Sequence, residues 1–160
     1  MKFRTENKIR MKNLLLYILL TVSFAVSAQE KDKTLPVGNE EYKQNKFVDA
    51  EANYRISESK FPKRSAAPYN LGNTIYKNKK YAEAISNYKN AALIANTSAQ
   101  KHKAYHNLGN AYMQDKNYKL AVASYKNALK ANAKDEKTRY NLALAKKLLK
   151  KYPPKPNPKN

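Results

Sequence analysis

Two histidines four residues apart, His102 and His106, have the type and spacing in this chain that best fit metal chemistry. On a helix they would share one face and could bind a metal ion together. The chain has no cysteine, and no third ligand follows at a motif spacing, so we expect both rings to be solvated or to line a groove. We predict no catalytic residue, metal site or cofactor, because the sequence contains no glycine-rich phosphate loop, nucleophile elbow or recognisable carboxylate pair.

The element that positions the remaining polar side chains is a repeat. Residues 69–76 read Tyr-Asn-Leu-Gly-Asn-Thr-Ile-Tyr, and residues 106–112 read His-Asn-Leu-Gly-Asn-Ala-Tyr. Each stretch is followed by Tyr-Lys-Asn-Ala, at 88–91 and 125–128. An internal repeat of this length indicates a stack of small units rather than one closed globule.

Four columns of residues share the same two offsets along the chain. Offsets of 34 and 37 residues relate Gly38, Gly72 and Gly109; Phe47, Tyr81 and Tyr118; Ala50, Ala84 and Ala121; and Tyr54, Tyr88 and Tyr125. This register predicts helical hairpins in which glycine lets the second helix approach closely and alanine marks the crossing point. We interpret the aromatic columns as core, with each tyrosine hydroxyl reaching solvent or a carbonyl.

At these residues the sequence resembles the tetratricopeptide repeat family, whose unit of about 34 residues carries a Leu-Gly-x-x-Tyr signature. The resemblance implies an all-α fold, a right-handed α-solenoid of three helix-turn-helix repeats followed by a C-terminal capping helix. We place a signal peptide at 1–28, repeats at 31–64, 65–101 and 102–135, the capping helix at 136–151 and a disordered Pro/Lys-rich tail at 152–160. The first repeat is degenerate, and the second has three extra residues in a loop at about 96–100.

The predicted capping helix repeats the first half of the motif, as Asn-Leu-Ala at 141–143, and no second helix follows. A solenoid end exposes an apolar face unless a helix with a polar far side covers it. Its lysines are Lys146, Lys147, Lys150 and Lys151, and the leucines expected to face inward are Leu142, Leu148 and Leu149. This distribution fits the capping role.

The resemblance also implies that the first helices of successive repeats line a concave groove. The implied groove residues are Asn39, Tyr42, Lys43, Tyr69, Asn70, Asn73, Tyr76, Lys77, Lys103, His106, Asn107, Asn110, Met113, Gln114, Lys137 and Tyr140. Amide side chains can bind the backbone of an extended peptide, and tyrosine rings offer flat apolar contact. The second asparagine of each motif, Asn73 and Asn110, is the one we expect to face a partner.

Chaperone-binding members of the family hold a C-terminal carboxylate with five side chains. Asn39, Asn70 and Lys103 match three of those five positions. Leu35 and Asn107 occupy the other two, so two cationic contacts are missing. Amides and one lysine would bind a carboxylate much less strongly than a charge-assisted network does.

The N-terminus predicts export. An apolar run from Leu14 to Val26 follows basic residues and ends at the small residues Val26-Ser27-Ala28. It is shorter than the roughly 20 residues that cross a bilayer as a helix. We expect a cleaved signal peptide and a mature chain from about Gln29. An uncleaved anchor is the alternative, and it would also place the repeats outside the cytoplasm.

Positive charge is concentrated in the second half of the chain. The formal net charge is +20; residues 29–64 carry 8 basic and 7 acidic side chains, whereas residues 65–160 carry 19 and 4. Such a surface attracts polyanions or acidic protein segments in a salt-dependent manner. Three interpretations remain open: ordinary solvated lysines, an acidic peptide or protein partner, and anionic lipid or cell-wall polymer. An exported protein seldom meets nucleic acid, so we expect no nucleic acid partner.

Residues 33–42, 101–110 and 138–146 resemble the BatC-type tetratricopeptide proteins of the bacterial aerotolerance (Bat) operon. The resemblance implies a periplasmic partner of membrane-anchored von Willebrand factor A domain proteins, with a role in oxidative or envelope stress. The function we predict is a non-enzymatic protein-interaction scaffold that binds a partner protein or extended peptide in the groove. The alternatives are an electrostatic binder of anionic lipid or cell-wall polymer, in peripheral contact with the membrane, and self-association into a longer superhelix.

Overall fold

A computed structural model describes residues 10–14, 17 and 31–154 of the chain. The chain divides into two compact units, Met1–Lys31 and Asp32–Asn160. In the first unit, residues 10–14 and 17 are helical. The predicted cleavage site and residues 155–160 of the predicted tail lie outside the described residues, as does most of the apolar run from 14 to 26. Within the described ranges, every helix is too short or too polar to cross a membrane.

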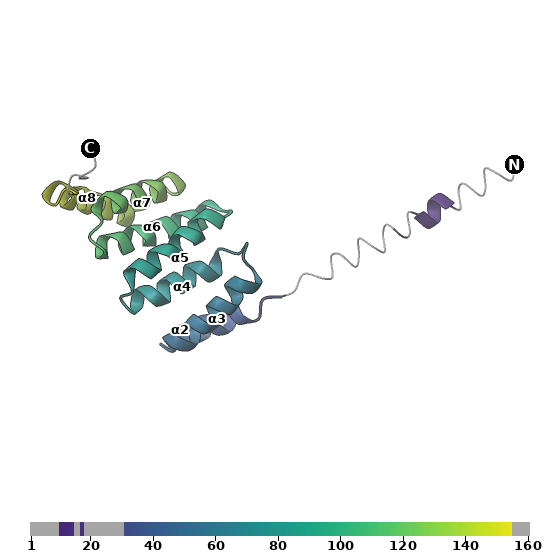
Figure 1. Ribbon diagram of the computed structural model, residues 1–160. Helices are drawn as coiled ribbons and strands as arrows, with labels where there is room; N and C mark the ends of the chain where they lie inside the picture. The colour runs from purple at the N-terminus through teal and green to yellow at the C-terminus, as the bar shows by residue number, and fades with distance from the viewer. Residues whose placement is uncertain (1–9, 15–16, 18–30, 155–160) are drawn as a thin grey trace, which may run out of the picture. The chain divides into compact units, whose positions relative to one another are not determined.

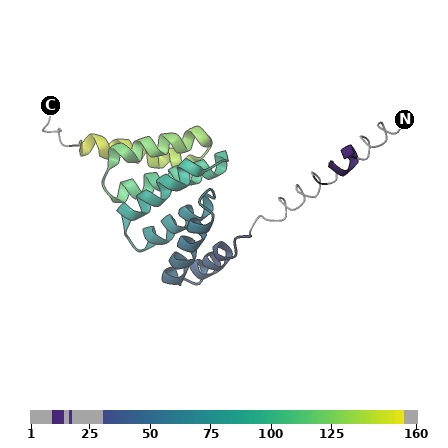
Figure 2. The ribbon, with the colours of Figure 1, turned by 45° about the vertical axis from the view of Figure 1, so that its right-hand side comes forward.

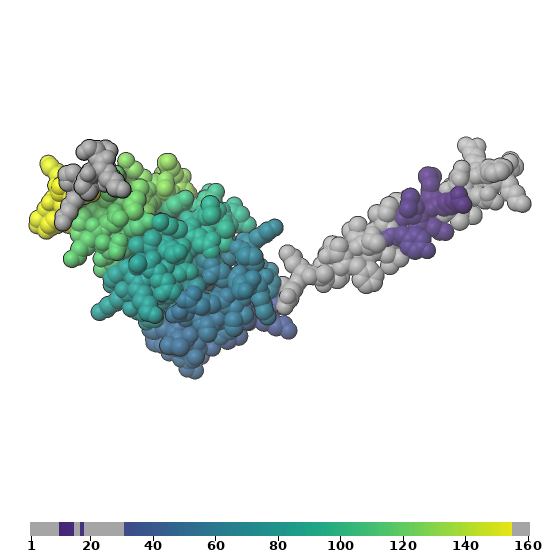
Figure 3. All heavy atoms as spheres, in the orientation of Figure 1, coloured from purple at the N-terminus to yellow at the C-terminus, as the bar shows by residue number. Residues whose placement is uncertain are grey.

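The second unit is a stack of helices that follow one another in chain order (Figures 1 and 2). Its helices are α2 (Thr34–Lys43), α3 (Phe47–Lys60), α4 (Ala66–Lys77), α5 (Tyr81–Ile94), α6 (Ser98–Gln114), α7 (Tyr118–Ala131) and α8 (Glu136–Lys151). Residues 31–154 contain no strand. Figure 3 shows these helices as one continuous packed body on the face in view. The predicted all-α solenoid of three hairpins and a final single helix is confirmed.

The glycine and tyrosine columns explain how each hairpin closes. A Cβ atom at Gly38, Gly72 or Gly109 would lie only 2.9, 2.8 or 2.5 Å from a ring atom of the tyrosine opposite it. Those tyrosines, Tyr54, Tyr88 and Tyr125, are at most 2 % exposed. The close approach predicted for glycine is therefore to a tyrosine ring, and any larger residue would push the two helices apart.

Each hairpin turns through one residue with left-handed backbone conformation. These residues are Asn45, Lys79 and Lys116, with φ angles of 60°, 60° and 58°. Backbone hydrogen bonds close the turns from Lys46 to Glu41, from Lys80 to Ile75 and from Asn117 to Tyr112. This is the six-to-one hydrogen bond of a Schellman motif, in a place where glycine is the usual residue.

The start of α6 differs from the sequence-based expectation. We predicted a loop at about 96–100, but α6 already begins at Ser98. Thr97 and Gln100 form a capping box, in which each side chain accepts a hydrogen bond from the other residue's backbone amide. The extra residues therefore lengthen the helix instead of the loop, and α6 has 17 residues where α4 has 12.

The last helix, α8, packs against α6 and α7 through one face. Thr138 and Ala145 are fully buried, and Leu142 packs against the main core. The lysines at 146, 147, 150 and 151 are exposed, and Leu148 and Leu149 are half-buried. The outer face is not entirely polar, because Tyr140 and Leu144 are 71 % and 38 % exposed.

Candidate peptide-binding groove

Two neighbouring hollows run along the first helices of the repeats. One, of about 280 Å³, is lined by Asn39, Tyr42, Lys43, Tyr54, Asn70 and Asn73. The next, of about 120 Å³, is lined by Tyr42, Asn73, Tyr76, Lys77, Tyr88, Asn107 and Asn110. Tyr42 and Asn73 belong to both, so the two hollows form one surface, called the groove below. Its lining contains two lysines and no carboxylate.

The floor of the groove is a ladder of asparagines that joins successive repeats. The hydroxyl of Tyr88 donates to Oδ1 of Asn73 over 2.8 Å, and Nδ2 of Asn107 in the next repeat donates to the same oxygen over 2.9 Å. The same arrangement occurs with Tyr54, Asn39 and Asn70 at 3.0 and 2.7 Å, and with Tyr125, Asn110 and Asn141 at 2.7 and 3.1 Å. Each rung thus combines a hairpin contact with a contact between repeats.

The ladder reduces the number of hydrogen-bonding groups that the second asparagine of each motif has left for a partner. Oδ1 of Asn73 and of Asn110 already accepts two hydrogen bonds within the fold. Among the described residues, Nδ2 of Asn39 and of Asn110 has no acceptor, and Oδ1 of Asn70 and of Asn107 has no donor. The groove therefore presents both unpaired amide donors and unpaired amide acceptors.

Burial keeps the tyrosines of the ladder protonated. It raises the pKa of Tyr54 to about 12 and also raises the pKa values of Tyr88 and Tyr125. Each hydroxyl therefore remains a donor well above neutral pH. In this structure the three hydroxyls donate to the asparagine oxygens Oδ1 of Asn39, Asn73 and Asn110.

The structure distributes the predicted groove residues over several places. It brings Asn39, Tyr42, Lys43, Asn70, Asn73, Tyr76, Lys77, Asn107 and Asn110 together in the groove. Tyr69 and Lys103 line a separate hollow between α4 and α6. Met113 packs against the core, whereas Gln114, Lys137 and Tyr140 are exposed on α6 and α8.

Residues 64–134 match the family model described as tetratricopeptide repeat. The first tetratricopeptide domain of Spaghetti (RPAP3), solved with the HSP90 peptide SRMEEVD, is 24 % identical with a TM-score of 0.68 over 73 % of this chain and 90 % of that one. The second such domain of human RPAP3, in complex with the HSP70 peptide SGPTIEEVD, is 21 % identical with a TM-score of 0.66 over 71 % and 92 %. The fold is that of a tetratricopeptide repeat domain.

The tetratricopeptide domain of Arabidopsis OM64 is similar as well, at 20 % identity and a TM-score of 0.65 over 71 % of this chain and 92 % of that one. No curated protein sequence matches the chain. At these identities the solved structures establish the tetratricopeptide fold, and the chemistry of the groove has to be derived from the side chains of this chain.

The ladder uses as donors the side chains at two of the five positions compared with a carboxylate clamp, Asn70 and Asn107. Nδ2 of Asn70 donates to Oδ1 of Asn39 over 2.7 Å, and Nδ2 of Asn107 donates to Tyr69 and Asn73. Lys103 lines the separate hollow between α4 and α6. Two of the amide nitrogens that could hold a carboxylate are therefore already donors within the fold.

The two histidines lie at the contact of α6 with α8. His102 approaches Asp135 at 2.8 Å and the carbonyl of Ala128 at 3.1 Å, and His106 meets the hydroxyl of Thr138 at 2.6 Å. Their side chains are 15 % and 12 % exposed, so our expectation of a solvated or groove-lining pair is wrong. Among residues 31–154, no three metal-binding side chains are grouped to hold an ion.

Sequence reasoning missed two contributors to the ladder. We predicted the hydroxyls of the tyrosine column to reach solvent or a carbonyl, whereas each donates to an asparagine side chain. Asn141 was not among the predicted groove residues, although it donates to Asn110. The signal for Asn141 was present, because Asn70, Asn107 and Asn141 form one column whose successive members are 37 and 34 residues apart.

Proposed function

We propose that this chain is a non-enzymatic scaffold whose groove binds an extended, acidic segment of a partner protein. The observation that carries the proposal is the asparagine ladder, which leaves unpaired amide donors and acceptors on one surface beside Lys43 and Lys77. An extended peptide exposes both kinds of backbone group, so this surface can satisfy it without reading its sequence.

The ladder also lowers the cost of binding. Its asparagines are held in place before a partner arrives, so fewer side chains lose rotational freedom when the peptide is bound. Tyr42 and Tyr76 add flat apolar contact area, and they pack edge-on against Phe47 and Tyr81.

Charge favours an acidic partner over a neutral or basic one. Lys43 and Lys77 line the groove without a lining carboxylate, and residues 65–160 carry 19 basic and 4 acidic side chains. Two similar domains were solved with the peptides SRMEEVD and SGPTIEEVD, which are rich in glutamate and aspartate. These neighbours support the general mode of binding rather than a particular partner.

The finer part of the proposal places this scaffold in the bacterial envelope as part of a Bat aerotolerance or stress complex. Its supports are the signal-like N-terminal sequence and the resemblance of three segments to BatC-type proteins. Membrane-anchored von Willebrand factor A domain proteins are the partners this resemblance implies. N-terminal sequencing of the protein from a fractionated host would test export: we expect a periplasmic chain that begins near Gln29, and an intact N-terminus in the cytoplasm would contradict it.

Cleavage near Gln29 is compatible with the folded repeats. The first side chain that the second unit uses is Asp32, which accepts hydrogen bonds from the amides of Thr34 and Leu35 at the start of α2. A chain that begins at residue 29 would keep this contact.

The groove is tested with a labelled octapeptide, capped at both ends and containing four acidic residues, in fluorescence anisotropy. A Lys43→Glu/Lys77→Glu variant reverses the two charges of the groove, and we expect it to weaken binding on the order of tenfold. A Lys119→Glu/Lys126→Glu variant is the matched control, because it changes the net charge equally at exposed positions on α7 that line neither hollow. Equal losses in the two variants, or no binding by the wild type, would contradict the groove.

The charge asymmetry also supports a second candidate, an electrostatic binder of anionic lipid or cell-wall polymer. Co-sedimentation with vesicles rich in anionic lipid, over a salt series, separates the two. Surface binding should fade steeply with salt and respond equally to both double variants. Binding by the groove should depend on Lys43 and Lys77 in particular.

A further inference from the structure

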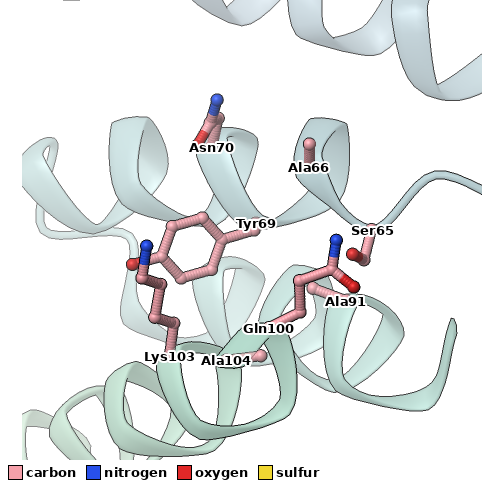
Figure 4. Close-up of a pocket in the computed structure, with 8 residues that line it drawn as sticks. All are labelled: Ser65, Ala66, Tyr69, Asn70, Ala91, Gln100, Lys103 and Ala104. Atoms are coloured by element: carbon pink, nitrogen blue, oxygen red, sulfur yellow. The ribbon is translucent and has the colours of Figure 1, made fainter. Parts of the chain in front are cut away.

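A separate hollow of about 220 Å³ lies between α4 and α6 (Figure 4). Its walls are the methyl groups of Ala66, Ala91 and Ala104 and the ring of Tyr69. Gln100 and Lys103 rise from α6 at its edge toward α4. Ser65, Asn70, Gln100 and Lys103 supply the polar part of its lining. We call this hollow the α4–α6 pocket.

The pocket exists because α6 is longer than α4. In the repeat register, Lys103 of α6 is equivalent to Ala66, the first residue of α4. The residues of α6 from Ser98 to His102 therefore have no counterpart in α4. Gln100 belongs to these added turns and is held there by the capping box with Thr97. The packing beneath consists of Ala91 and Ala104, whose small side chains do not fill the space between the helices.

The next repeat interface shows the same space filled by the chain itself. The offset of 37 residues maps Ser65 to His102 and Tyr69 to His106. The ring of His102 reaches Asp135 and the carbonyl of Ala128, and that of His106 reaches Thr138. Between α4 and α6, the position of His102 is held by a serine. The hollow is therefore not a requirement of the fold.

We propose that the α4–α6 pocket is a specificity site that takes one leucine-sized aliphatic side chain from an acidic peptide bound in the groove. A cavity of roughly 150 Å³ is large enough to hold benzene, so the space suits a branched aliphatic group. Asn70 lines both the pocket and the groove, so the two hollows adjoin at this residue. Lys103 at the edge, with no carboxylate in the lining, favours an acidic residue beside the aliphatic one.

This inference rests on the proposed function, and the experiment separates the two. Two capped octapeptides with four acidic residues each, identical except for a central leucine or alanine, are compared by fluorescence anisotropy. Burial of the larger side chain should make the leucine peptide bind about tenfold more tightly. Binding of both peptides with equal affinity would overturn the pocket and leave the groove standing. Binding of neither peptide would overturn both.

Two variants fill the pocket from different walls. Ala66→Leu adds a side chain where the next repeat carries Lys103, and Ser65→His copies the residue at 102. Each should abolish the preference for leucine while the alanine peptide still binds. Ala123→Leu, at an exposed position on α7, is the matched control and should keep the preference. A preference that survives in folded pocket-filling variants would overturn the assignment.

A direct measurement does not depend on whether the variants fold. A leucine peptide labelled with ¹³C in its methyl groups, bound to the wild-type chain, should give nuclear Overhauser contacts to the methyl groups of Ala66 and Ala104 and to the ring of Tyr69. Contacts confined to the groove tyrosines, Tyr42 and Tyr76, would place the side chain elsewhere and overturn the proposal.

Discussion

Single residues in this protein are constrained by the partner that each meets across the hairpin. The three glycines of the first helices face the rings of the three buried tyrosines. Each tyrosine in turn directs its hydroxyl to an asparagine on the first helix of its own repeat. Glycine, tyrosine and asparagine are thus linked by direct contacts, and we expect a substitution of one of them to disturb the packing or hydrogen bonding of the other two.

We expect Gly72→Ala to destabilise the protein, although alanine is normally the better helix former by about 1 kcal/mol. The added Cβ would lie 2.8 Å from ring atoms of Tyr88, which is 2 % exposed and cannot move without disturbing Asn73. Overpacking of this kind costs roughly 1–3 kcal/mol. Urea unfolding measures the loss. Ser86→Ala, at an exposed site on α5, is the control and should be nearly neutral.

The clash can be isolated by a second substitution. Tyr88→Leu removes the ring that the new methyl group meets, so the double variant should be more stable than the sum of the two single losses indicates. Strict additivity would mean that the ring is not the obstacle.

Helices and turns show where sequence reasoning ends. The offsets of Gly72, Ala84 and Tyr88 predict the hairpins because each residue type suits the same contact in every repeat. The turns gave no comparable signal. Lys79 and Lys116 adopt the left-handed backbone conformation, in which glycine is the usual residue, so their residue type does not predict it. The early start of α6 could have been found, because Thr97 and Gln100 have the spacing of a capping box.

The groove was predictable in part for a similar reason. A column of asparagines indicates a shared position, and the structure does bring Asn39, Asn73 and Asn110 into equivalent sites. The column in the sequence does not reveal that each Oδ1 accepts a hydrogen bond from an asparagine of the following repeat. That contact depends on how neighbouring hairpins are offset. Only the assembled stack determines which half of each amide remains for a partner.

The contact between α6 and α8 should weaken in acid. Burial lowers the pKa of His106 below its usual 6.5; nearby His102 and Lys137 add to this effect, and Asp135 opposes it. The unfolded chain therefore binds a proton at higher pH than the folded chain does. Stability should be fully present above pH 6.5 and decline as the pH falls below it.

Urea unfolding between pH 5 and pH 8 tests this expectation. His106→Gln removes the titrating group and keeps a polar side chain near Thr138, so its unfolding free energy should decline less toward pH 5 than that of the wild type. Lys101→Gln, at an exposed site on the same helix, should leave the pH dependence unchanged. Parallel curves for wild type and His106→Gln would show that this histidine does not link stability to pH.

Across the whole stack, stability should be lowest in the first repeat. Helix α2 buries only Gly38, whereas α4 buries six residues and α6 five. Repeats contact only their neighbours, so a weak terminal repeat can open while the rest stays folded. One side chain opposes this opening: Asp32 accepts hydrogen bonds from the amides of Thr34 and Leu35 and, over 2.5 Å, from the hydroxyl of Ser57 on α3.

Asp32 should therefore control the opening of the first repeat. Burial alone would raise its pKa, but the hydrogen bonds from Ser57, Leu35 and Thr34 hold the pKa below the usual 3.8. The carboxylate thus stabilises the fold above that value, and its contribution is lost as the pH falls through the lower folded-state pKa. Near neutral pH, removal of the carboxylate should cost about as much as loss of a helix cap, roughly 0.5–2 kcal/mol.

Hydrogen exchange followed helix by helix shows whether that cost is local. In Asp32→Ala we expect amides of α2 to exchange on the order of tenfold faster, as a cap energy of this size implies, while those of α6 and α7 keep their wild-type rates. Ser59→Ala, at an exposed position on α3, should leave both regions unchanged. A uniform acceleration over all helices would instead mean that the stack unfolds as one unit, because a nearest-neighbour solenoid confines the effect of a terminal contact to the repeat that makes it.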